Sequence, residues 1–252
     1  MIEIHRKVLF VKVCNRFFDR CMDFVKERRS IMGFSHSLEQ RDGLQPFQTV
    51  HIDLEKTEVE LFSGIEKENR RQIRKAEKQN MQFVVLEQPS DAELKKFQLF
   101  YNRFAKQKRT NRCRSFHVHT MKKLAQKNAL AFTYMSDEAN KNIHCYRIYV
   151  TDGDIAMTLY SASNHNVNTS SEAKRHVSEA NRYLIWKNMM RFKKKGVRTL
   201  DMGGLTDKPS IQKFKTGFGG EFVTVYSGYI ANSFVGKLII FVRKQFQTKG
   251  QL

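Results

Sequence analysis

Cysteine and proline are scarce in this sequence, and long apolar runs are missing. The four cysteines, at positions 14, 21, 113 and 145, form no C-x-x-C pair. This argues against a zinc or disulfide framework and favours a reduced, cytoplasmic protein. The N-terminus lacks the apolar stretch of a signal peptide, and the longest apolar run near the end, residues 238–242, is far too short to span a bilayer. With three prolines and no Ser- or Gly-rich tract, no interdomain linker stands out.

Common catalytic motifs are also missing. The sequence contains no G-x-S-x-G, no H-E-x-x-H and no Walker loop. His117 and His119 lie two residues apart, but no third metal ligand is near them in the sequence. The glycines of "GFGGEF" precede a strand and not a helix, so they do not form a dinucleotide fingerprint. We therefore expect no metal, no bound cofactor and no covalent nucleophile.

Positive charge is the abundant feature. The 252 residues include 45 Lys and Arg against 25 Asp and Glu, a formal net charge of +20. Such an excess predicts anionic partners: nucleic acid, phosphates or an acidic membrane surface. Because 40% of the residues are hydrophobic, the chain can still bury a substantial core.

One long helix is predicted over residues 57–79, after a strand at 49–54. At 100° per residue, one side of this helix carries a mostly apolar stripe. The stripe contains Phe62, Ile65, Asn69, Ile73 and Ala76. The cations gather on the other side: Lys67, Arg70, Arg71, Arg74, Lys75 and Lys78.

The rest of the chain alternates strands and helices. A strand at 81–87 precedes helices at 91–106 and 119–127, joined by the acid-free segment 103–114. Three strands, at 130–135, 143–151 and 154–163, follow, and Asp152-Gly153 predicts a hairpin turn between the last two. A helix at 178–195 closed by Gly196, a strand at 197–202, a helix at 209–217, a strand at 221–230 and a tail helix at 234–247 complete the order. The crossover after residue 163 sets two parallel neighbours, so we expect a mixed α/β sheet flanked by helices.

Four sequence blocks together resemble the Fem family of peptidoglycan-bridge aminoacyltransferases. "ENRRQIRKAEKQN", "TLYSASNHN", "ANRYLIWKNMMRFKKKGVRTLDMGG" and "IQKFKTGFGGEF" match the blocks of that family's second acetyltransferase-like domain, in order, over residues 48–230. They also match related acyltransferases of exopolysaccharide clusters. The resemblance implies a GNAT fold. It also implies three segments: an N-terminal extension at 1–47, a remnant of a first domain or a strand-helix cap; the acyltransferase domain at 48–232; and a basic amphipathic helix at 233–252.

Two departures from acetyl-CoA enzymes of the wider superfamily bear on the donor. Those enzymes cradle the pyrophosphate of the cofactor with a glycine-rich loop, whereas residues 166–178 contain no glycine. Many of them place a tyrosine acid in the short helix after the fifth strand, whereas this chain has Phe214 and Phe218 there. Both departures favour aminoacyl-tRNA over acyl-CoA as the co-substrate.

The resemblance implies a catalytic group of Lys215, Asp201 and Tyr160. Lys215 matches the lysine that faces the reacting centre in Fem enzymes, where a cation stabilises the developing oxyanion. Asp201 would orient the amine or the lysine, and Tyr160 lies where the acyl group enters the sheet. The alternatives are a surface lysine, a turn cap and an aromatic core residue.

The same resemblance implies the substrate-binding positions. Ser161 follows Tyr160, and Gly203 and Gly204 leave room for close approach of a ligand. Family members use an arginine cluster against acceptor phosphates, and here Arg71 and Arg74 match it best; the alternative is a solvated face. Arg70 and Lys78 complete this set.

Two functions from different classes follow. The first is an N-acyltransferase acting on a phosphorylated or lipid-linked precursor of peptidoglycan or polysaccharide, with tRNA or CoA carrying the acyl group. The second is a non-catalytic module that binds RNA or a membrane surface. The "DMGG" and "FKTGFGG" blocks favour the enzyme. The tail helix gathers Phe234, Val235, Leu238, Ile239, Phe241 and Val242 beside Lys237, Arg243 and Lys244, which predicts either peripheral contact with the inner face of the membrane or docking on the sheet.

Overall fold

The computed structural model describes residues 1–8, 10–20, 30–137, 142–164 and 170–248, and it divides into two compact units. Unit 1 contains Met1–Thr49 and Val223–Leu252, and unit 2 contains Val50–Phe222. Strands β4 (Gln45–Asp53) and β10 (Glu221–Ala231) carry the chain from one unit to the other. The residues expected to form an N-terminal extension thus share a unit with the C-terminal residues.

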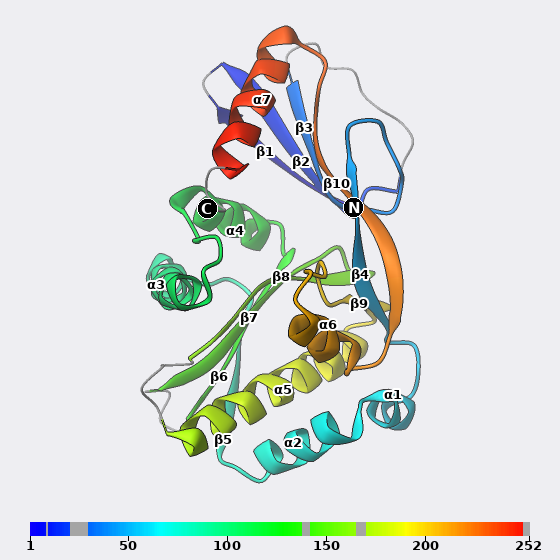
Figure 1. Ribbon diagram of the computed structural model, residues 1–252, viewed down its shortest axis with the longest axis vertical. Coiled ribbons are helices and arrows are strands. Elements are labelled where there is room, and N and C mark those ends of the chain that lie inside the picture. The colour runs from blue at the N-terminus through cyan, green and yellow to red at the C-terminus, as the bar shows by residue number, and fades with distance from the viewer. Residues whose placement is uncertain (9, 21–29, 138–141, 165–169, 249–252) are drawn as a thin grey trace. The chain divides into compact units, whose positions relative to one another are not determined.

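Unit 1 is a small sheet with one helix. Strands β1 (Ile2–Val8) and β2 (Val11–Phe17) form an antiparallel hairpin, β3 (Ser30–Ser37) pairs parallel with β2, and β10 pairs antiparallel with β3. Helix α7 (Phe234–Thr248) lies beside this sheet (Figure 1). Its Ile239 and Ile240 pack against Val11, Val13 and Ile31 of the sheet. The opposite side of α7 is apolar too. Phe234, Val235, Leu238 and Phe241 are 83%, 56%, 51% and 59% exposed.

Unit 2 contains a six-stranded mixed sheet in the order β4-β9-β8-β7-β6-β5. Its further strands are β5 (Met81–Leu86), β6 (Leu130–Asp137), β7 (Ile143–Thr151), β8 (Ile155–Ser163) and β9 (Thr199–Asp201). Strands β8 and β9 are parallel, as the crossover predicted, and the other neighbours are antiparallel. Gly153 takes φ +92° in the expected turn between β7 and β8.

Helices cover both faces of this sheet (Figure 1). On one face lie α1 (Glu58–Gly64), α2 (Lys67–Glu77), α5 (Ser171–Lys194) and α6 (Pro209–Thr216). There Ile65, Ile73, Met189 and Phe192 share a buried cluster with strand residues such as Leu200. On the other face lie α3 (Asp91–Lys108) and α4 (Ser115–Gln126), and the ring of Phe97 contacts those of Phe132 and Tyr146.

The single helix predicted over residues 57–79 is wrong, because the structure contains two. Helix α1 ends at Gly64, and Ile65 is extended with ψ 139°. Glycine is a poor helix former, and the break lets Ile65 reach the core, where it is 1% exposed. Arg70 donates hydrogen bonds to the carbonyl oxygens of Ser63 and Ile65 at 2.6 and 2.5 Å. The apolar stripe itself is confirmed, with Asn69, Ile73 and Ala76 buried.

Helix α5 begins seven residues earlier than expected, at Ser171 and not at 178. Ser170 caps it by accepting a hydrogen bond from the Ala173 amide at 3.2 Å. The glycine-free stretch 166–178 is therefore partly helix, and its residues up to 169 lie outside the described residues. None of the helices in the described part of the chain combines the length and apolar character that crossing a bilayer requires.

Candidate active site

Strands β8 and β9 pair over only three positions and then separate. Their register couples Ile155 with Thr199, Ala156 with Leu200 and Met157 with Asp201. Strand β9 ends there, whereas β8 continues to Ser163. The backbone of β8 beyond Met157 therefore has no β9 partner, and ligands of open α/β sheets bind at such carboxyl ends.

The chain turns sharply where β9 ends. Gly203 adopts φ +76°, and a Cβ at this position would lie 2.9 Å from the carbonyl oxygen of Thr158. A side chain is thus excluded on both conformational and steric grounds. The Gly203 amide donates to Asp201 Oδ1 at 2.7 Å, which fixes the turn.

Lys215 lies on α6 and reaches back to this turn. Its Nζ donates to the carbonyl oxygens of Gly203 and Gly204 at 2.8 and 2.7 Å. An ammonium group has three donors, so one remains for a ligand. Burial, aided by the nearby Arg147 and opposed by Asp201, lowers the pKa of Lys215 to about 8.

Asp201 alternates with Leu200 and Met202 of the buried α5-side cluster, so its side chain points to the other face of the sheet. It is 1% exposed, and its Oδ2 lies 3.4 Å from Nε2 of His51, the residue opposite it on β4. Asp201 therefore connects the Gly203 turn to β4 in addition to acting on Lys215. The sequence placed Asp201 and Lys215 together through the family resemblance, and the structure brings them into one electrostatic group.

A β-bulge separates Tyr160 from this group. Tyr149 pairs with Thr158 and Ile148 pairs with Tyr160, so Leu159 is an extra residue in β8. One inserted residue reverses which face the following side chains occupy. Tyr160 accordingly points to the α3–α4 face, where its ring contacts those of Phe97, Tyr101 and His117. Burial raises its pKa, with Cys113 adding to the shift.

Ser161 occupies the other face as a result of the same bulge. It pairs with Arg147 of β7, whose guanidinium lies on the side of α5 and α6. The sequence analysis assigned Tyr160 and Ser161 to one site, whereas the structure places them on opposite faces of the sheet. Only Ser161 shares a face with Lys215.

Two arginines that the sequence did not single out lie against Phe214, the residue before Lys215. Arg147, only 3% exposed, places its Cζ 5.9 Å from the ring centroid of Phe214, and Arg182 of α5 places its Cζ 5.2 Å from the same centroid. Each of these arginines contacts residues from distant segments of the chain, so no short sequence motif identifies it. Their partners are uncharged: Asn181 and the Tyr149 hydroxyl for Arg147, and Asn69 and Ser178 for Arg182.

Asn69 occurs in the apolar stripe of α2 because its side-chain amide forms two hydrogen bonds there. Its Nδ2 donates to the Gly217 carbonyl oxygen at 2.8 Å, and its Oδ1 accepts from Arg182 Nε at 2.7 Å. This amide thus joins α2, α5 and the end of α6. A Cβ on Gly217 would lie 2.6 Å from Asn69 Nδ2, so glycine permits the contact.

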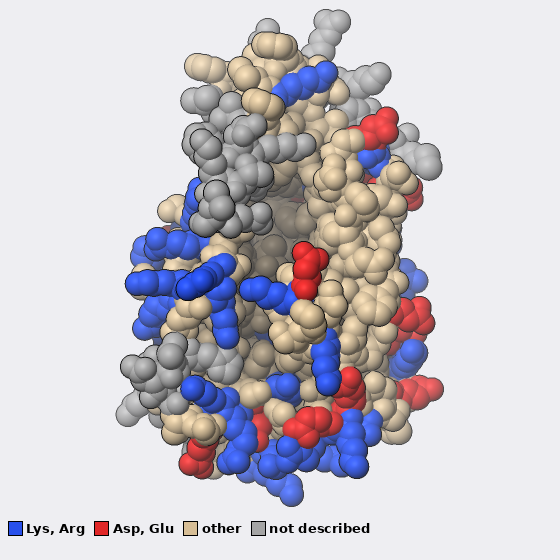
Figure 2. Space-filling model, in the orientation of Figure 1, with Lys and Arg blue, Asp and Glu red and all other residues tan. Residues whose placement is uncertain are grey.

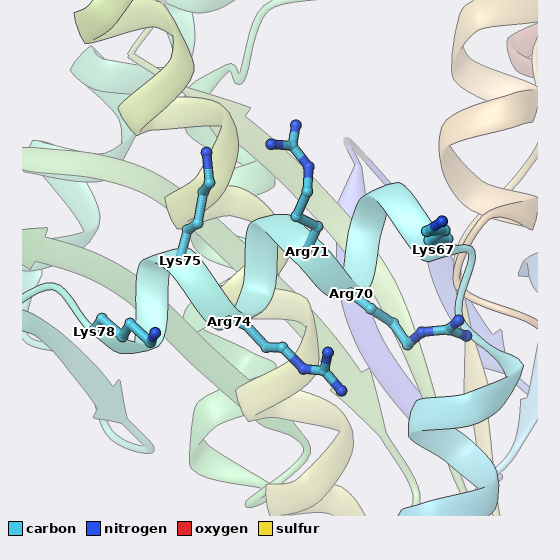
Figure 3. Close-up of a pocket in the computed structure, with 6 residues that line it drawn as sticks. All are labelled: Lys67, Arg70, Arg71, Arg74, Lys75 and Lys78. Atoms are coloured by element: carbon cyan, nitrogen blue, oxygen red, sulfur yellow. The ribbon is translucent and has the colours of Figure 1, made fainter.

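The cations of α2 surround a surface hollow of about 450 Å³ (Figure 3). Arg71 and Lys75 point to one side of the helix, and Arg70 and Arg74 point to the other. Figure 2 shows Lys and Arg gathered in the lower part of the view, where Figure 1 places α2. All six of the predicted cations line the hollow: Lys67, Arg70, Arg71, Arg74, Lys75 and Lys78.

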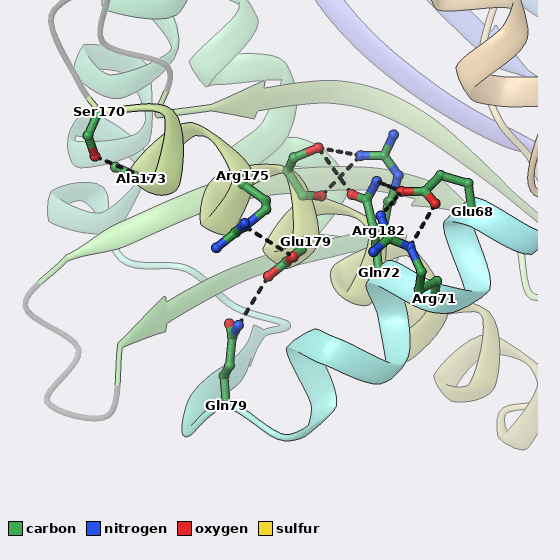
Figure 4. Close-up of polar contacts among 10 residues, drawn as sticks. Glu68, Arg71, Gln72, Gln79, Ser170, Ala173, Arg175, Glu179 and Arg182 are labelled. Carbon is green, nitrogen blue, oxygen red and sulfur yellow. Dashed lines mark hydrogen bonds and ion pairs between the residues drawn. The ribbon is translucent and has the colours of Figure 1, made fainter.

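These α2 side chains differ in how far they are engaged. Arg71 forms a two-point ion pair with Glu68, which lowers the pKa of Glu68 to about 2 (Figure 4). Arg74 lies over the ring of Phe62 at 5.2 Å, and Arg70 is held by the carbonyls at the end of α1. The expectation that these arginines all project away from the apolar stripe is therefore wrong for Arg70 and Arg74.

A possible ligand set for a metal ion lies in unit 1. Ligand atoms of Glu3, His5 and Cys14 on the β1–β2 hairpin lie within 4.8 Å of one another. Glu3 is already hydrogen bonded to Arg16 at 2.7 Å, and Cys14 is buried. We assign no metal to these residues.

Comparison with known proteins identifies the fold. No family model and no curated protein match the sequence. A crystal structure of FemX superposes with a TM-score of 0.65 and 12% identity, over 91% of this chain and 84% of that chain. A structure of L-PGS from Bacillus licheniformis gives 0.52 and 13%, over 96% and 84%. A domain named as the C-terminal domain of a lysylphosphatidylglycerol synthetase from Agrobacterium fabrum gives 0.55 and 10%, over 95% and 83%. The chain therefore has the Fem-type, GNAT-like mixed α/β fold that its sequence blocks implied.

Proposed function

We propose that this protein is an N-acyltransferase that moves an aminoacyl group from aminoacyl-tRNA to an amine of a cell-envelope precursor. The observation that carries the proposal is the position of Lys215, held by the Gly203–Gly204 turn where β8 and β9 separate. The fold shared with FemX supports the same class of reaction.

The chemistry requires no protein nucleophile. The acceptor amine attacks the ester carbonyl of the donor, an amide bond forms, and the ester C–O bond breaks. The amine loses one proton, and the departing ribose hydroxyl gains one. Catalysis then depends on holding both substrates in line and on stabilising the oxyanion. The remaining donor of the Lys215 ammonium suits the second task.

The charges around the site favour an anionic donor. Arg147, Arg182 and Lys215 lie on one face of the sheet, and the chain as a whole carries +20. An RNA complex held by such charges weakens steeply with salt, because each neutralised phosphate releases roughly 0.7–0.9 of a counterion. An acyl-CoA donor is the alternative, since it is also anionic but much smaller.

One titration separates the two donors. Calorimetry with bulk tRNA and with acetyl-CoA, each at several salt concentrations, should show salt-dependent binding of tRNA and weak binding of acetyl-CoA. Micromolar binding of acetyl-CoA together with salt-insensitive tRNA binding would contradict the proposal. A non-catalytic RNA-binding role would appear as tRNA binding that the Lys215→Met variant keeps, with no transfer to any amine acceptor by the wild type.

For the acceptor we propose a phosphorylated envelope precursor that contacts the α2 cations. Arg71, Lys75 and Lys78 are exposed there, and charge-assisted hydrogen bonds to phosphate are strong. The Glu68 carboxylate competes for Arg71, so an incoming phosphate must replace that ion pair.

A further inference from the structure

The ring of Phe214 contacts two guanidinium groups, and neither has an acidic partner. Arg182 and Arg147 lie 5.2 and 5.9 Å from its centroid, and Lys215 is the next residue on α6. Within the described residues, no carboxylate oxygen lies within 4.0 Å of a nitrogen of these three cations. Three positive groups are thus concentrated on one face, while Glu68 acts on Arg182 and Asp201 acts on Lys215 from beyond ion-pair distance.

The hydrogen-bond partners of the two arginines orient them without neutralising them. Arg147 Nε donates to Asn181 Oδ1 at 3.3 Å. Arg182 donates through Nε to Asn69 and through Nη1 to Ser178. Amide and hydroxyl groups fix the planar guanidinium but carry no charge, so the positive potential of the pair remains available.

Burying such charges without a counter-ion is unfavourable. Arg147 is 3% exposed, and burial lowers the pKa of Arg182. An unpaired charge in a low-dielectric site carries an uncompensated desolvation cost. A bound anion would remove this cost, and a planar, pre-oriented guanidinium is well suited to phosphate.

Part of the cluster is accessible to solvent. Arg147 lies at its base, opposite Ser161 in the β7–β8 pairing. Around it, Ser161, Arg182, Phe214 and Lys215 are only partly buried. A phosphate entering between these residues would meet two guanidinium groups and a hydroxyl.

We propose that Arg147, Arg182 and Ser161 form a phosphate subsite beside Lys215. The proposal that this phosphate belongs to a substrate rests on the proposed function. The binding of phosphate to these residues is independent of that function. It is distinct from the α2 cations, of which Arg71, Lys75 and Lys78 are exposed and Arg71 forms an ion pair with Glu68. Two sources of phosphate fit: the terminal phosphodiester of an RNA donor, or the pyrophosphate of CoA or of a nucleotide-linked acceptor.

Pyrophosphate is a suitable probe for calorimetry at constant ionic strength. We expect Arg182→Gln to weaken pyrophosphate binding by about tenfold or more, since charge-assisted hydrogen bonds are lost. Arg175→Gln is the matched control, because Arg175 is an exposed arginine on the same helix. The double variant Arg71→Gln/Arg74→Gln reports any binding to α2. Folded Arg182→Gln protein with wild-type affinity would overturn the proposal, as would loss of binding in the α2 double variant alone.

Arg147→Gln is the second test, and its buried position makes failure to fold a possible result. Wild-type protein provides a readout that needs no variant: bound pyrophosphate should protect Arg182 from modification by phenylglyoxal, followed by peptide mass spectrometry. Unchanged modification of Arg182 at saturating pyrophosphate would contradict the subsite.

Competition experiments then assign the source of the phosphate. A short RNA hairpin ending in CCA and free CoA are each titrated against bound pyrophosphate. Displacement by the RNA alone supports a donor phosphodiester, and displacement by CoA alone supports a pyrophosphate. If pyrophosphate binds at Arg182 but no aminoacyl transfer is found, the subsite stands and the proposed function fails.

Discussion

The Lys215 ammonium donates a hydrogen bond to the Gly203 carbonyl oxygen at 2.8 Å. A group proposed for catalysis is therefore also a structural tie between α6 and the turn after β9. Because the Gly203 amide is held in turn by Asp201, the position of Lys215 depends on both ends of this short segment.

Lys215→Met is expected to lower kcat by about 10²–10³, the usual effect of removing one preorganised oxyanion donor. KM for the donor should change little, because the interaction strengthens only in the transition state. Lys208→Met and Lys213→Met are the controls, since both lysines are exposed near or on the same helix. A Lys215→Met enzyme with wild-type kcat would show that the lysine only fixes the turn.

The reactivity of Lys215 should depend on pH with a midpoint near 8. Burial and Arg147 depress its pKa to about 8, so the amine form appears well below the pH at which exposed lysines lose their proton. Acetylation by an N-hydroxysuccinimide ester, quantified by mass spectrometry, should rise through that range. Arg147→Gln removes a positive neighbour and should move the midpoint up, whereas Asp201→Asn removes a negative one and should move it down. Shifts of the opposite sign would refute this account of the site.

Tyr160→Phe tests whether the bulge at Leu159 removes Tyr160 from the chemistry. Its ring lies among Phe97, Tyr101 and His117 on the α3–α4 face, so kcat should stay within about twofold of wild type while the melting temperature changes. A loss of kcat similar to that of Lys215→Met would instead support the catalytic role that the resemblance implies.

Arg70→Gln should destabilise the protein, because two carbonyl oxygens at the end of α1 lose their donor. Hydrogen bonds to charged groups contribute about 1.5–3 kcal/mol, and urea unfolding would measure the change. Lys67→Gln on the same helix should be close to neutral.

By contrast, Arg71→Gln with Lys75→Gln should raise KM for a phosphorylated acceptor without lowering stability.

Helix α7 is expected to bind anionic lipid surfaces. Its outer side exposes Phe234, Leu238 and Phe241, and no acidic residue occurs from position 222 to 252. Replacing these three residues by serine should abolish flotation with phosphatidylglycerol vesicles, because the buried apolar area and the positive charge act together. Leu99→Ser, an exposed apolar residue on α3, is the control. Equal flotation of the triple variant and the wild type would contradict lipid binding by α7. A triple variant that changes only the oligomeric state would contradict it too.

Local patterns were enough to predict much of unit 2. The strands β7 and β8 were predicted with Asp152-Gly153 as their turn, and Pro209 predicted the start of α6. The predicted elements differ from the structure where tertiary contacts determine the local conformation. Arg70 satisfies the carbonyls at the break between α1 and α2, and the strands of residues 1–37 were not predicted one by one.

The residues of the candidate site also divide into those that the sequence predicted and those that it did not. Lys215, Asp201, Gly203 and Gly204 lie within 15 consecutive positions, as the sequence numbering shows, and the structure brings them together. Arg147 and Arg182 come from β7 and α5, and only the packing of Phe214 makes them neighbours. An inserted residue such as Leu159 has no signature in a run of strand-forming residues, so the face of Tyr160 could not be deduced from alternation.

The division of unit 1 between the two ends of the chain has a consequence for synthesis. Strand β3 ends at Ser37, and its partner β10 begins only at Glu221. At roughly 5–20 residues per second on the ribosome, β3 waits on the order of 10–40 s for that partner. During this interval, while the strands β5–β9 are being synthesised, its unpaired edge is a target for chaperones and for neighbouring nascent chains. Slower translation of residues 38–220 would therefore lower the yield of soluble protein without altering the finished fold.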